Sequence, residues 1–247
     1  VIFTPLDADQ GILESVLPRR NQLDRPRVAN VTRVLVVMAY SQPKPDLMLL
    51  DRLLFLAEFN NISACITLNK SDLETHFRTS QILGYYPQHY PVISASARTK
   101  LGLEELNKAI QGEITVLAGP SGVGKSRLLQ QLTGNENIRI GEMSRKAQRG
   151  KHTTRHVELF PLSQGGWLVD TPGFSIMDMP ALKREELPRY FPDFAQPSQE
   201  CKFSNCLHHR ENECGVKIAA TEKLILPSRY NNYIAMLEEV MEKEKNY

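Results

Sequence analysis

The feature that most constrains the fold is a glycine-rich segment at residues 119–126, which matches the pattern G-x-x-x-x-G-K-[ST]. In this pattern, glycines let backbone N–H groups turn toward phosphate oxygens, the lysine reaches the β- and γ-phosphates, and the final hydroxyl binds Mg²⁺. An apolar run ends at Ala118 and residues 127–132 have a helical pattern, so the segment joins a strand to a helix N-terminus. The candidate phosphate-binding residues are Gly119, Pro120, Ser121, Gly122, Val123, Gly124, Lys125 and Ser126.

Strands and helices alternate around this segment, which predicts an α/β fold. Apolar runs predict strands at residues 34–39, 64–68, 91–93, 114–118 and 167–170. Asp46 is the predicted N-cap of a helix with apolar positions at Leu47, Leu50, Leu54 and Ala57. Such alternation predicts a mainly parallel sheet with helices on both faces.

The alternation stops after about Pro180. The chain then closes with one amphipathic helix, for which Ser228 is the predicted N-cap. Its apolar stripe consists of Tyr230, Tyr233, Ile234, Leu237, Val240 and Met241. We interpret this stripe as a packing surface.

Two further motifs each follow a predicted strand. Asn69, Lys70 and Asp72 resemble the N-K-x-D motif of GTPases. The chemistry fits guanine, because a carboxylate accepts from both N1–H and the 2-amino group, an amide donates to N7, and a lysine stem covers the ring. Residues 94–99 resemble the S-A-x motif, whose alanine amide meets guanine O6, and two registers fit. We prefer Ser96 and Ala97, because residues 98–99 and 102–103 then fall where GTPases have them.

Candidate switch residues follow the phosphate segment. Asp170 and Gly173 match D-x-x-G after a strand. We expect Asp170 to hold Mg²⁺ through water and the Gly173 amide to sense the γ-phosphate. Upstream, Thr153 and Thr154 are both candidates for the residue that binds Mg²⁺ only in the GTP state, and we favour Thr154.

The order of these motifs is rotated. An ordinary GTPase has the phosphate loop first and the base-reading motifs last, whereas here the base-reading residues 69–72 and 96–97 precede residues 119–126. One site can still form if the sheet is circularly permuted. In that arrangement the D-x-x-G motif leads directly into the C-terminal segment, so we hypothesise that γ-phosphate contacts at Gly173 set the position of that segment.

Cysteines cluster near the C-terminus. Cys201, Cys206 and Cys214 lie within fourteen residues that also contain His208 and His209, while Cys65 lies alone in an apolar run. Three thiolates and one imidazole suit a closed, tetrahedral, structural Zn²⁺. The surrounding segment is short and polar, so a metal would help to fold it. The spacing differs from that of the commonest zinc fingers, and His209 is an alternative to His208.

The composition narrows the class of protein only slightly. The chain of 247 residues has 30 basic and 28 acidic residues, a net charge of +2 that neither requires nor excludes nucleic acid. It has neither an apolar run long enough for a membrane span nor a signal peptide. The first residues have no Met and read as mid-domain sequence, so we expect that an N-terminal portion is missing.

Together these motifs resemble the ribosome small-subunit-dependent GTPase A family, circularly permuted GTPases of bacteria and plastids. The resemblance covers nearly the whole chain and includes the phosphate loop, the cysteine cluster and residues 17–20, 26–30, 149–159 and 170–174. It implies an N-terminal OB domain, a central GTPase domain and a C-terminal zinc domain. We therefore expect the tail of the OB domain with its linker at residues 1–30, the permuted GTPase domain at 31–180, and the zinc-binding domain with its C-terminal helix at 181–247.

The resemblance also implies ligands and partners. The family has zinc ligands at the positions of Cys201, Cys206, His208 and Cys214, and it binds the small ribosomal subunit and its rRNA late in assembly. Lys100 replaces a glycine that is common in the S-A-x loop, which predicts a tighter loop. Basic patches that could contact RNA comprise Arg19, Arg20, Arg25, Arg27, Arg145, Lys146, Arg149, Lys151 and Arg155. We expect a monomer in bacterial cytoplasm or plastid stroma, neither secreted nor membrane-bound.

The expected reaction is GTP hydrolysis, with Lys125 and Mg²⁺ neutralising charge on the phosphates and Ser126 and Thr154 as Mg²⁺ ligands. Phe174 occupies the position of the glutamine that orients water in many small GTPases. His152, His156 or a ribosomal group must then replace it, and hydrolysis should be slow until a partner stimulates it. The alternative is a GTP-dependent RNA-binding scaffold with negligible hydrolysis.

Overall fold

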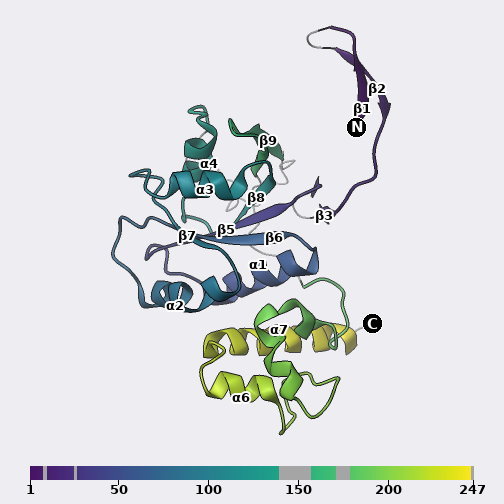
Figure 1. Cartoon of the computed structure of the whole chain (residues 1–247), viewed down its shortest axis with the longest axis vertical. Helices are drawn as coiled ribbons and strands as arrows, with labels where there is room; N and C mark the ends of the chain where they lie inside the picture. The colour runs from purple at the N-terminus through teal and green to yellow at the C-terminus, as the bar shows by residue number, and fades with distance from the viewer. Residues whose placement is uncertain (8–9, 25–26, 139–156, 171–178, 246–247) are drawn as a thin grey trace.

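The computed structural model describes residues 1–7, 10–24, 27–138, 157–170 and 179–245. Within these residues a six-stranded sheet has the order β7-β6-β5-β8-β10-β9 (Figure 1). Its strands are β5 (Arg33–Ala39), β6 (Ser63–Asn69), β7 (Val92–Ser94), β8 (Ile114–Ala118), β9 (Glu158–Pro161) and β10 (Trp167–Asp170). Every neighbouring pair is parallel except β9 and β10. The mainly parallel sheet is confirmed, and the five predicted strands agree with the observed bounds to within one residue.

Helices cover both faces of this sheet. In Figure 1, α1 (Leu47–Phe59) and α2 (Phe77–Tyr85) lie below it, while α3 (Leu103–Ile110) and α4 (Lys125–Thr133) lie above it. A short 3₁₀ turn, η1 (Tyr86–Gln88), follows α2. The predicted N-cap of α1 is confirmed, because the Asp46 side chain accepts a hydrogen bond from the Leu49 N–H at 3.1 Å.

The central strand β5 explains why the helices divide in this way. Val34, Val36 and Met38 pack into the core that contains α1 and α2, and Leu35 and Val37 pack into the core that contains α3 and α4. All five side chains are buried, since alternate residues of a strand point to opposite faces. The continuous apolar run in the sequence therefore corresponds to a strand covered on both sides.

Two small hairpins precede the sheet. One pairs β1 (Ile2–Pro5) with β2 (Gly11–Ser15), and the other pairs β3 (Gln22–Asp24) with β4 (Arg27–Ala29). The first hairpin lies apart from the sheet at the top right of Figure 1, and every residue of its two strands is exposed. Its assignment to an OB domain stays a prediction, as do the three domain boundaries.

The C-terminal part is mostly helical turns. Three 3₁₀ turns and two helices form it, namely η2 (Leu187–Tyr190), η3 (Pro192–Phe194), η4 (Pro197–Glu200), α6 (Gly215–Thr221) and α7 (Pro227–Lys245). The predicted apolar stripe of α7 is confirmed as a packing surface, with Tyr233, Leu237 and Val240 buried in a core shared with α1. The predicted N-cap Ser228 is wrong, because α7 already begins at Pro227, a residue that suits the first helical position.

A fully buried ionic cluster joins α1 to the C-terminal part. Arg229 of α7 contacts Asp51 of α1 at 2.8 Å and Asp193 of η3 at 2.9 Å, and all three side chains are at most 1% exposed. The hydroxyls of Tyr86 and Tyr85 donate to Asp51 and Asp193 at 2.6 and 2.7 Å. Burial works against ionisation of Asp193, but the charge and hydrogen bonds of Arg229 outweigh it and lower the pKa of this carboxyl. The cluster therefore ties the C-terminal part to the helix layer that covers one face of the six-stranded sheet.

Candidate functional site

The amide side chain of Asn69 joins the base-reading and phosphate-binding motifs. Its Nδ2 donates to the Val123 carbonyl in the glycine-rich loop at 2.7 Å, and its Oδ1 accepts from the Ala97 N–H at 3.0 Å. Asn69 is the last residue of β6 and is only 2% exposed, so both ends of a buried amide are satisfied. Three segments that are far apart in the sequence thus meet at one edge of the sheet.

Asp72 and Ser96 form the second contact between these segments. The Ser96 hydroxyl donates to the Asp72 carboxylate at 2.5 Å and accepts from the Thr99 N–H at 3.1 Å. That hydrogen bond is the main cause that lowers the pKa of Asp72. Ser94, in contrast, ends β7 and its hydroxyl lies 3.0 Å from the Tyr40 hydroxyl. The contacts therefore favour the Ser96–Ala97 register over the one beginning at Ser94.

Lys70 reaches across to the glycine-rich loop. Its Nζ donates to the Gly122 carbonyl at 2.7 Å and to the Gln42 carbonyl at 2.6 Å, in the segment between β5 and α1. Partial burial lowers the pKa of Lys70, and the nearby Asp72 opposes this effect. The lysine stem is thereby stretched along the mouth of the pocket, where it can cover one face of a base.

The glycine-rich loop follows β8 and closes onto α4. Gly124 has φ +97°, and a Cβ at this position would overlap the Asn69 Nδ2 atom, so only glycine fits. The Lys125 Nζ donates to the carbonyls of Gly119 and Pro120 at 2.6 and 2.8 Å. Ser126 is the next residue of α4, so both predicted phosphate-end side chains lie at a helix N-terminus.

A pocket of 210 Å³ lies between these segments. Asn69, Asp72 and Ala97 of the base-reading motifs line it together with Gly124 of the glycine-rich loop and Arg127 of α4. Carboxylate, amide and backbone N–H groups thus converge on a space beside a loop suited to phosphate. This arrangement can bind a guanine nucleotide.

The switch residues are described only in part. Asp170 ends β10, and its backbone pairs with Glu158 of β9. His152, Thr153, Thr154 and Gly173 lie outside the described residues, as do Phe174 and His156. Their predicted roles, and the hypothesis that Gly173 positions the C-terminal part, stay predictions.

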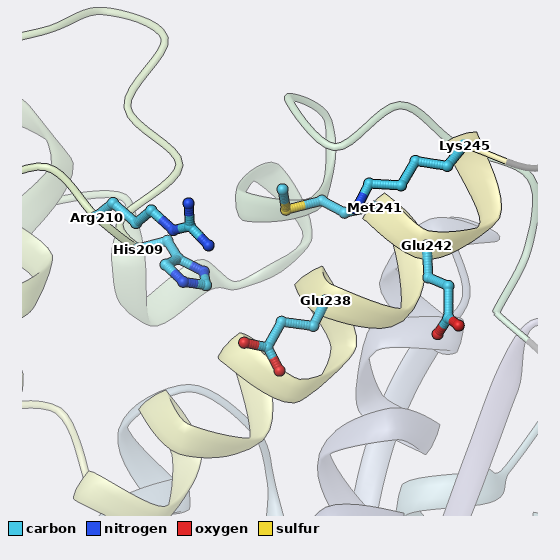
Figure 2. Close-up of a pocket in the computed structure, with 6 residues that line it drawn as sticks. All are labelled: His209, Arg210, Glu238, Met241, Glu242 and Lys245. Atoms are coloured by element: carbon cyan, nitrogen blue, oxygen red, sulfur yellow. The ribbon is translucent and has the colours of Figure 1, made fainter.

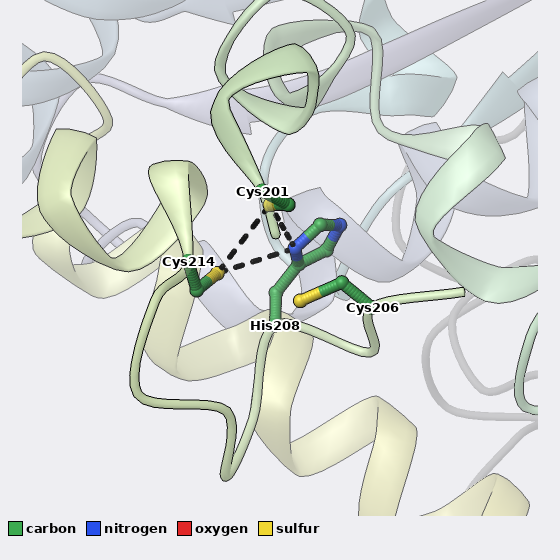
Figure 3. Close-up of side chains that lie close together, drawn as sticks. All are labelled: Cys201, Cys206, His208 and Cys214. Carbon is green, nitrogen blue, oxygen red and sulfur yellow. Dashed lines mark hydrogen bonds between the residues drawn. The ribbon is translucent and has the colours of Figure 1, made fainter. Parts of the chain in front are cut away.

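The four predicted zinc ligands lie together. Donor atoms of Cys201, Cys206, His208 and Cys214 all lie within 4.8 Å of one another (Figure 3). The Cys201 Sγ lies 3.8 Å from the Cys214 Sγ, and the His208 Nδ1 lies 3.5 and 3.4 Å from these two sulfurs. A tetrahedral Zn²⁺ with bonds of about 2.3 Å to sulfur and about 2.0 Å to nitrogen has edges close to these lengths. The donor set therefore fits zinc.

The protonation chemistry of the cluster agrees with a metal site. Burial raises the pKa of Cys206 to about 12 and lowers the pKa of His208. The imidazole is then neutral, and a bound cation would supply the charge that lets the buried thiols ionise. His209 is not in the cluster, and its Nδ1 has no hydrogen-bond partner among the described residues.

His209 instead lines a separate hollow of 420 Å³ between its loop and α7. Figure 2 shows its ring facing the helix, with Arg210 beside it and Glu238 across the gap. Both basic and acidic side chains line this hollow, and none of the predicted nucleotide or zinc ligands does so. It therefore belongs to neither predicted site.

Comparison with known proteins identifies the family. The sequence pattern of the RsgA GTPase family matches residues 16–180, which is more than half of the chain. The chain belongs to the RsgA GTPase family. Family membership makes it a GTPase, a hydrolase that acts on GTP, as the motifs predicted.

Relatives in the RsgA family align with this chain along its whole length. It is 46% identical over 248 residues to the small ribosomal subunit biogenesis GTPase RsgA of Alkaliphilus metalliredigens, covering 100% of this chain and 85% of that protein. It is 43% identical to the protein of the same name from Moorella thermoacetica, with the same coverage.

Two solved structures support the permuted fold. The crystal structure of YjeQ from Thermotoga maritima has a TM-score of 0.82 and 37% identity, covering 97% of this chain and 82% of that one. The structure of YloQ, described as a circularly permuted GTPase, has a TM-score of 0.78 and 32% identity, covering 98% and 79%. The permutation inferred from the motif order is therefore confirmed.

Sequence reasoning did not select three residues that line the pocket, Leu73, Arg98 and Arg127. Arg127 follows the G-x-x-x-x-G-K-[ST] pattern by one position, so the pattern itself gave no reason to select it. Its position in the first turn of the helix after the loop was the available signal.

Proposed function

We propose that this RsgA-family GTPase binds the small ribosomal subunit and its rRNA and acts in late maturation of that subunit. The observation that carries the GTP-binding part of the proposal is the Asn69 side chain, which hydrogen-bonds to Val123 and Ala97 and so brings the permuted motifs together. The name shared by the relatives, small ribosomal subunit biogenesis GTPase, supports the choice of partner.

In this proposal the base is read by Asp72, by the second hydrogen of the Asn69 amide, and by the Ala97 N–H, which exchanges its bond to Asn69 for one to the base. Lys70 covers one ring face. Lys125 exchanges its two loop carbonyls for phosphate oxygens when nucleotide enters. Ser126 and Thr154 hold Mg²⁺, with Asp170 acting through water. The ion neutralises negative charge on the β- and γ-phosphates, as Lys125 does from the other side.

In many small GTPases a glutamine directly after D-x-x-G orients the attacking water. Phe174 occupies that position here, so we propose that another group orients the water. His152 is the candidate within the chain, and a group on the ribosomal subunit is the alternative. In either case the subunit supplies or positions this group, so hydrolysis is slow without the subunit and faster with it.

Zinc completes the proposed set of cofactors. Cys201, Cys206, His208 and Cys214 hold one structural Zn²⁺ that has no open position for catalysis. A monomer that works where ribosomes are assembled, in bacterial cytoplasm or plastid stroma, fits this function. Among the described residues, no helix combines the length and apolar character that crossing a membrane requires.

The test measures GTP turnover by the purified chain alone, with small ribosomal subunits and with large subunits, using ATP as the control nucleotide. We expect slow turnover of GTP only, raised at least about tenfold by small subunits, by analogy with partner-stimulated GTPases. Lys125→Ala should abolish the stimulated rate. Stimulation by large subunits alone would contradict the proposed partner.

The second candidate function is a GTP-dependent RNA-binding scaffold, which the Phe174 substitution favours. It predicts that the chain binds small subunits more tightly with GTP than with GDP while stimulated turnover stays at the basal rate. If small subunits do stimulate turnover, a His152→Ala variant tests which group orients the water. Unchanged stimulated turnover in this variant would remove His152 from the mechanism.

A further inference from the structure

Arg127 is an unexplained cation inside the nucleotide pocket. It is the third residue of α4 and lines the same 210 Å³ pocket as Asp72, Ala97 and Gly124. The residue is exposed. It thus shares one pocket with residues of the base-reading motifs and with a glycine of the loop suited to phosphates.

The packing of α4 does not require this side chain. The helix is held by Leu128, Leu129 and Leu132, which are all buried in the core of the upper sheet face. Arg127 projects from another side of the helix and forms no hydrogen bond or ion pair with any residue that the structure describes. A structural role for its guanidinium is therefore not apparent from its contacts.

The neighbouring cations differ from it in this respect. Lys70 donates to two carbonyls, and Arg98 lies 3.6 Å from the Asp72 carboxylate. These two are engaged with the protein before any nucleotide binds. Arg127 keeps all its donors available to a ligand.

The position of Arg127 is electrostatically unfavourable without an anion. The first turn of a helix carries partial positive charge, so a cation there is destabilising. Lys125 adds a second cation to the same turn, and that turn has no acidic residue. A bound phosphate would reverse the sign of both interactions.

We propose that the guanidinium of Arg127 binds the α-phosphate of the guanine nucleotide. This inference rests on the proposed nucleotide site. Lys125 is proposed to bind the β- and γ-phosphates. Arg127 lies on the side of α4 that lines the pocket together with Asp72. The phosphate nearest the base is therefore the one within its reach, and a planar guanidinium can hold two phosphate oxygens at once.

The test measures the dissociation constant of GDP by calorimetry for the wild-type chain, Arg127→Gln, Arg127→Lys and the control Arg189→Gln. Arg189 is an exposed arginine in η2, away from the pocket, so its variant removes the same charge elsewhere. We expect Arg127→Gln to weaken GDP binding about tenfold, Arg127→Lys to lie between it and wild type, and Arg189→Gln to match wild type.

Salt dependence separates a phosphate contact from a contact with the base. An ionic contact is screened, so the ratio of the Arg127→Gln and wild-type dissociation constants should fall as salt rises from about 0.05 to about 0.5 M. Thermal unfolding of each variant in the absence of nucleotide checks that the fold is unchanged, as expected for an exposed side chain without partners.

Two results would overturn the inference while leaving the proposed function intact. One is equal GDP affinity for Arg127→Gln and wild type; the other is a weakened affinity whose ratio to wild type does not change with salt. A wild-type chain that binds no GDP would overturn both the inference and the nucleotide site on which it rests.

Discussion

At the scale of single residues, the site depends on polar side chains that are buried and fully paired. Asn69 uses both ends of its amide, and Ser96 both donates and accepts. Removing one partner of such a pair leaves the other unsatisfied, which costs about 1–3 kcal/mol. The pocket therefore tolerates little change in the groups that touch Asn69.

Gly124→Ala tests this tolerance. The added Cβ would occupy the place of the Asn69 Nδ2 atom, and alanine is strained at φ +97°. We expect the affinity for GDP, measured by calorimetry, to fall at least about tenfold because the Asn69–Val123 hydrogen bond is lost.

Gly84→Ala is the matched control. Gly84 lies in α2, its added Cβ would meet nothing within 4 Å, and the residue is exposed. GDP affinity should stay at the wild-type value, and stability should be equal or up to about 1 kcal/mol higher, since alanine favours helix. Equal GDP affinity in both variants would contradict the role given to Gly124.

At the scale of elements, the strands and the phosphate loop were predictable because their signals are local. Each β-strand of the parallel sheet is a short apolar run, and the loop is a contiguous pattern. The antiparallel β9, with only Phe160 buried, has no such run. The 3₁₀ turns before Cys201 were equally hidden, because their order comes from the core and the metal ligands around them rather than from periodicity.

Metal removal tests how far the C-terminal elements depend on zinc. We expect about one zinc per chain by metal analysis, close to none in Cys206→Ser, and an unchanged content in Cys65→Ala, whose thiol lies in β6 outside the cluster. A chelator should lower the thermal midpoint, because the ion binds the folded state only. A contribution of about 3 kcal/mol corresponds to roughly 6–12 °C.

The opposite result is also informative. If Cys65→Ala lost zinc to the same extent as Cys206→Ser, the metal would not reside in the proposed cluster. If the chelator removed zinc without changing the thermal midpoint, the buried apolar core would be sufficient to keep the C-terminal part folded without the metal.

At the scale of the whole molecule, the C-terminal part is attached through α1. The Arg229 cluster joins residues that the sequence separates by 178 and 36 positions. No local pattern marks Arg229, Asp51 or Asp193 as buried, since charged residues on helices usually face water. This interface is therefore the feature that sequence reasoning could not have found.

Arg229→Met tests the interface. Removing one partner of a buried ionic cluster leaves uncompensated carboxylates, so we expect the free energy of unfolding in urea to fall by about 3–5 kcal/mol. Arg52→Met is the control, because Arg52 bridges α1 and α7 through Glu239 at 2.5 Å but is partly exposed. That variant should lose about 1 kcal/mol or less. Equal losses in the two variants would show that burial of the Arg229 cluster adds nothing to the free energy of unfolding.

The order of strands also determines when each half of the pocket is synthesised. β5, β6 and β7 are neighbours in the sheet and follow one another along the chain, so the nascent protein holds the base-reading half in one contiguous, locally connected piece. β8 and residues 119–126 emerge later and insert beside β5. A ribosome making this protein therefore releases the proposed base-reading residues before the loop that would hold the phosphates, and the carbonyl of Val123 that holds Asn69 arrives last.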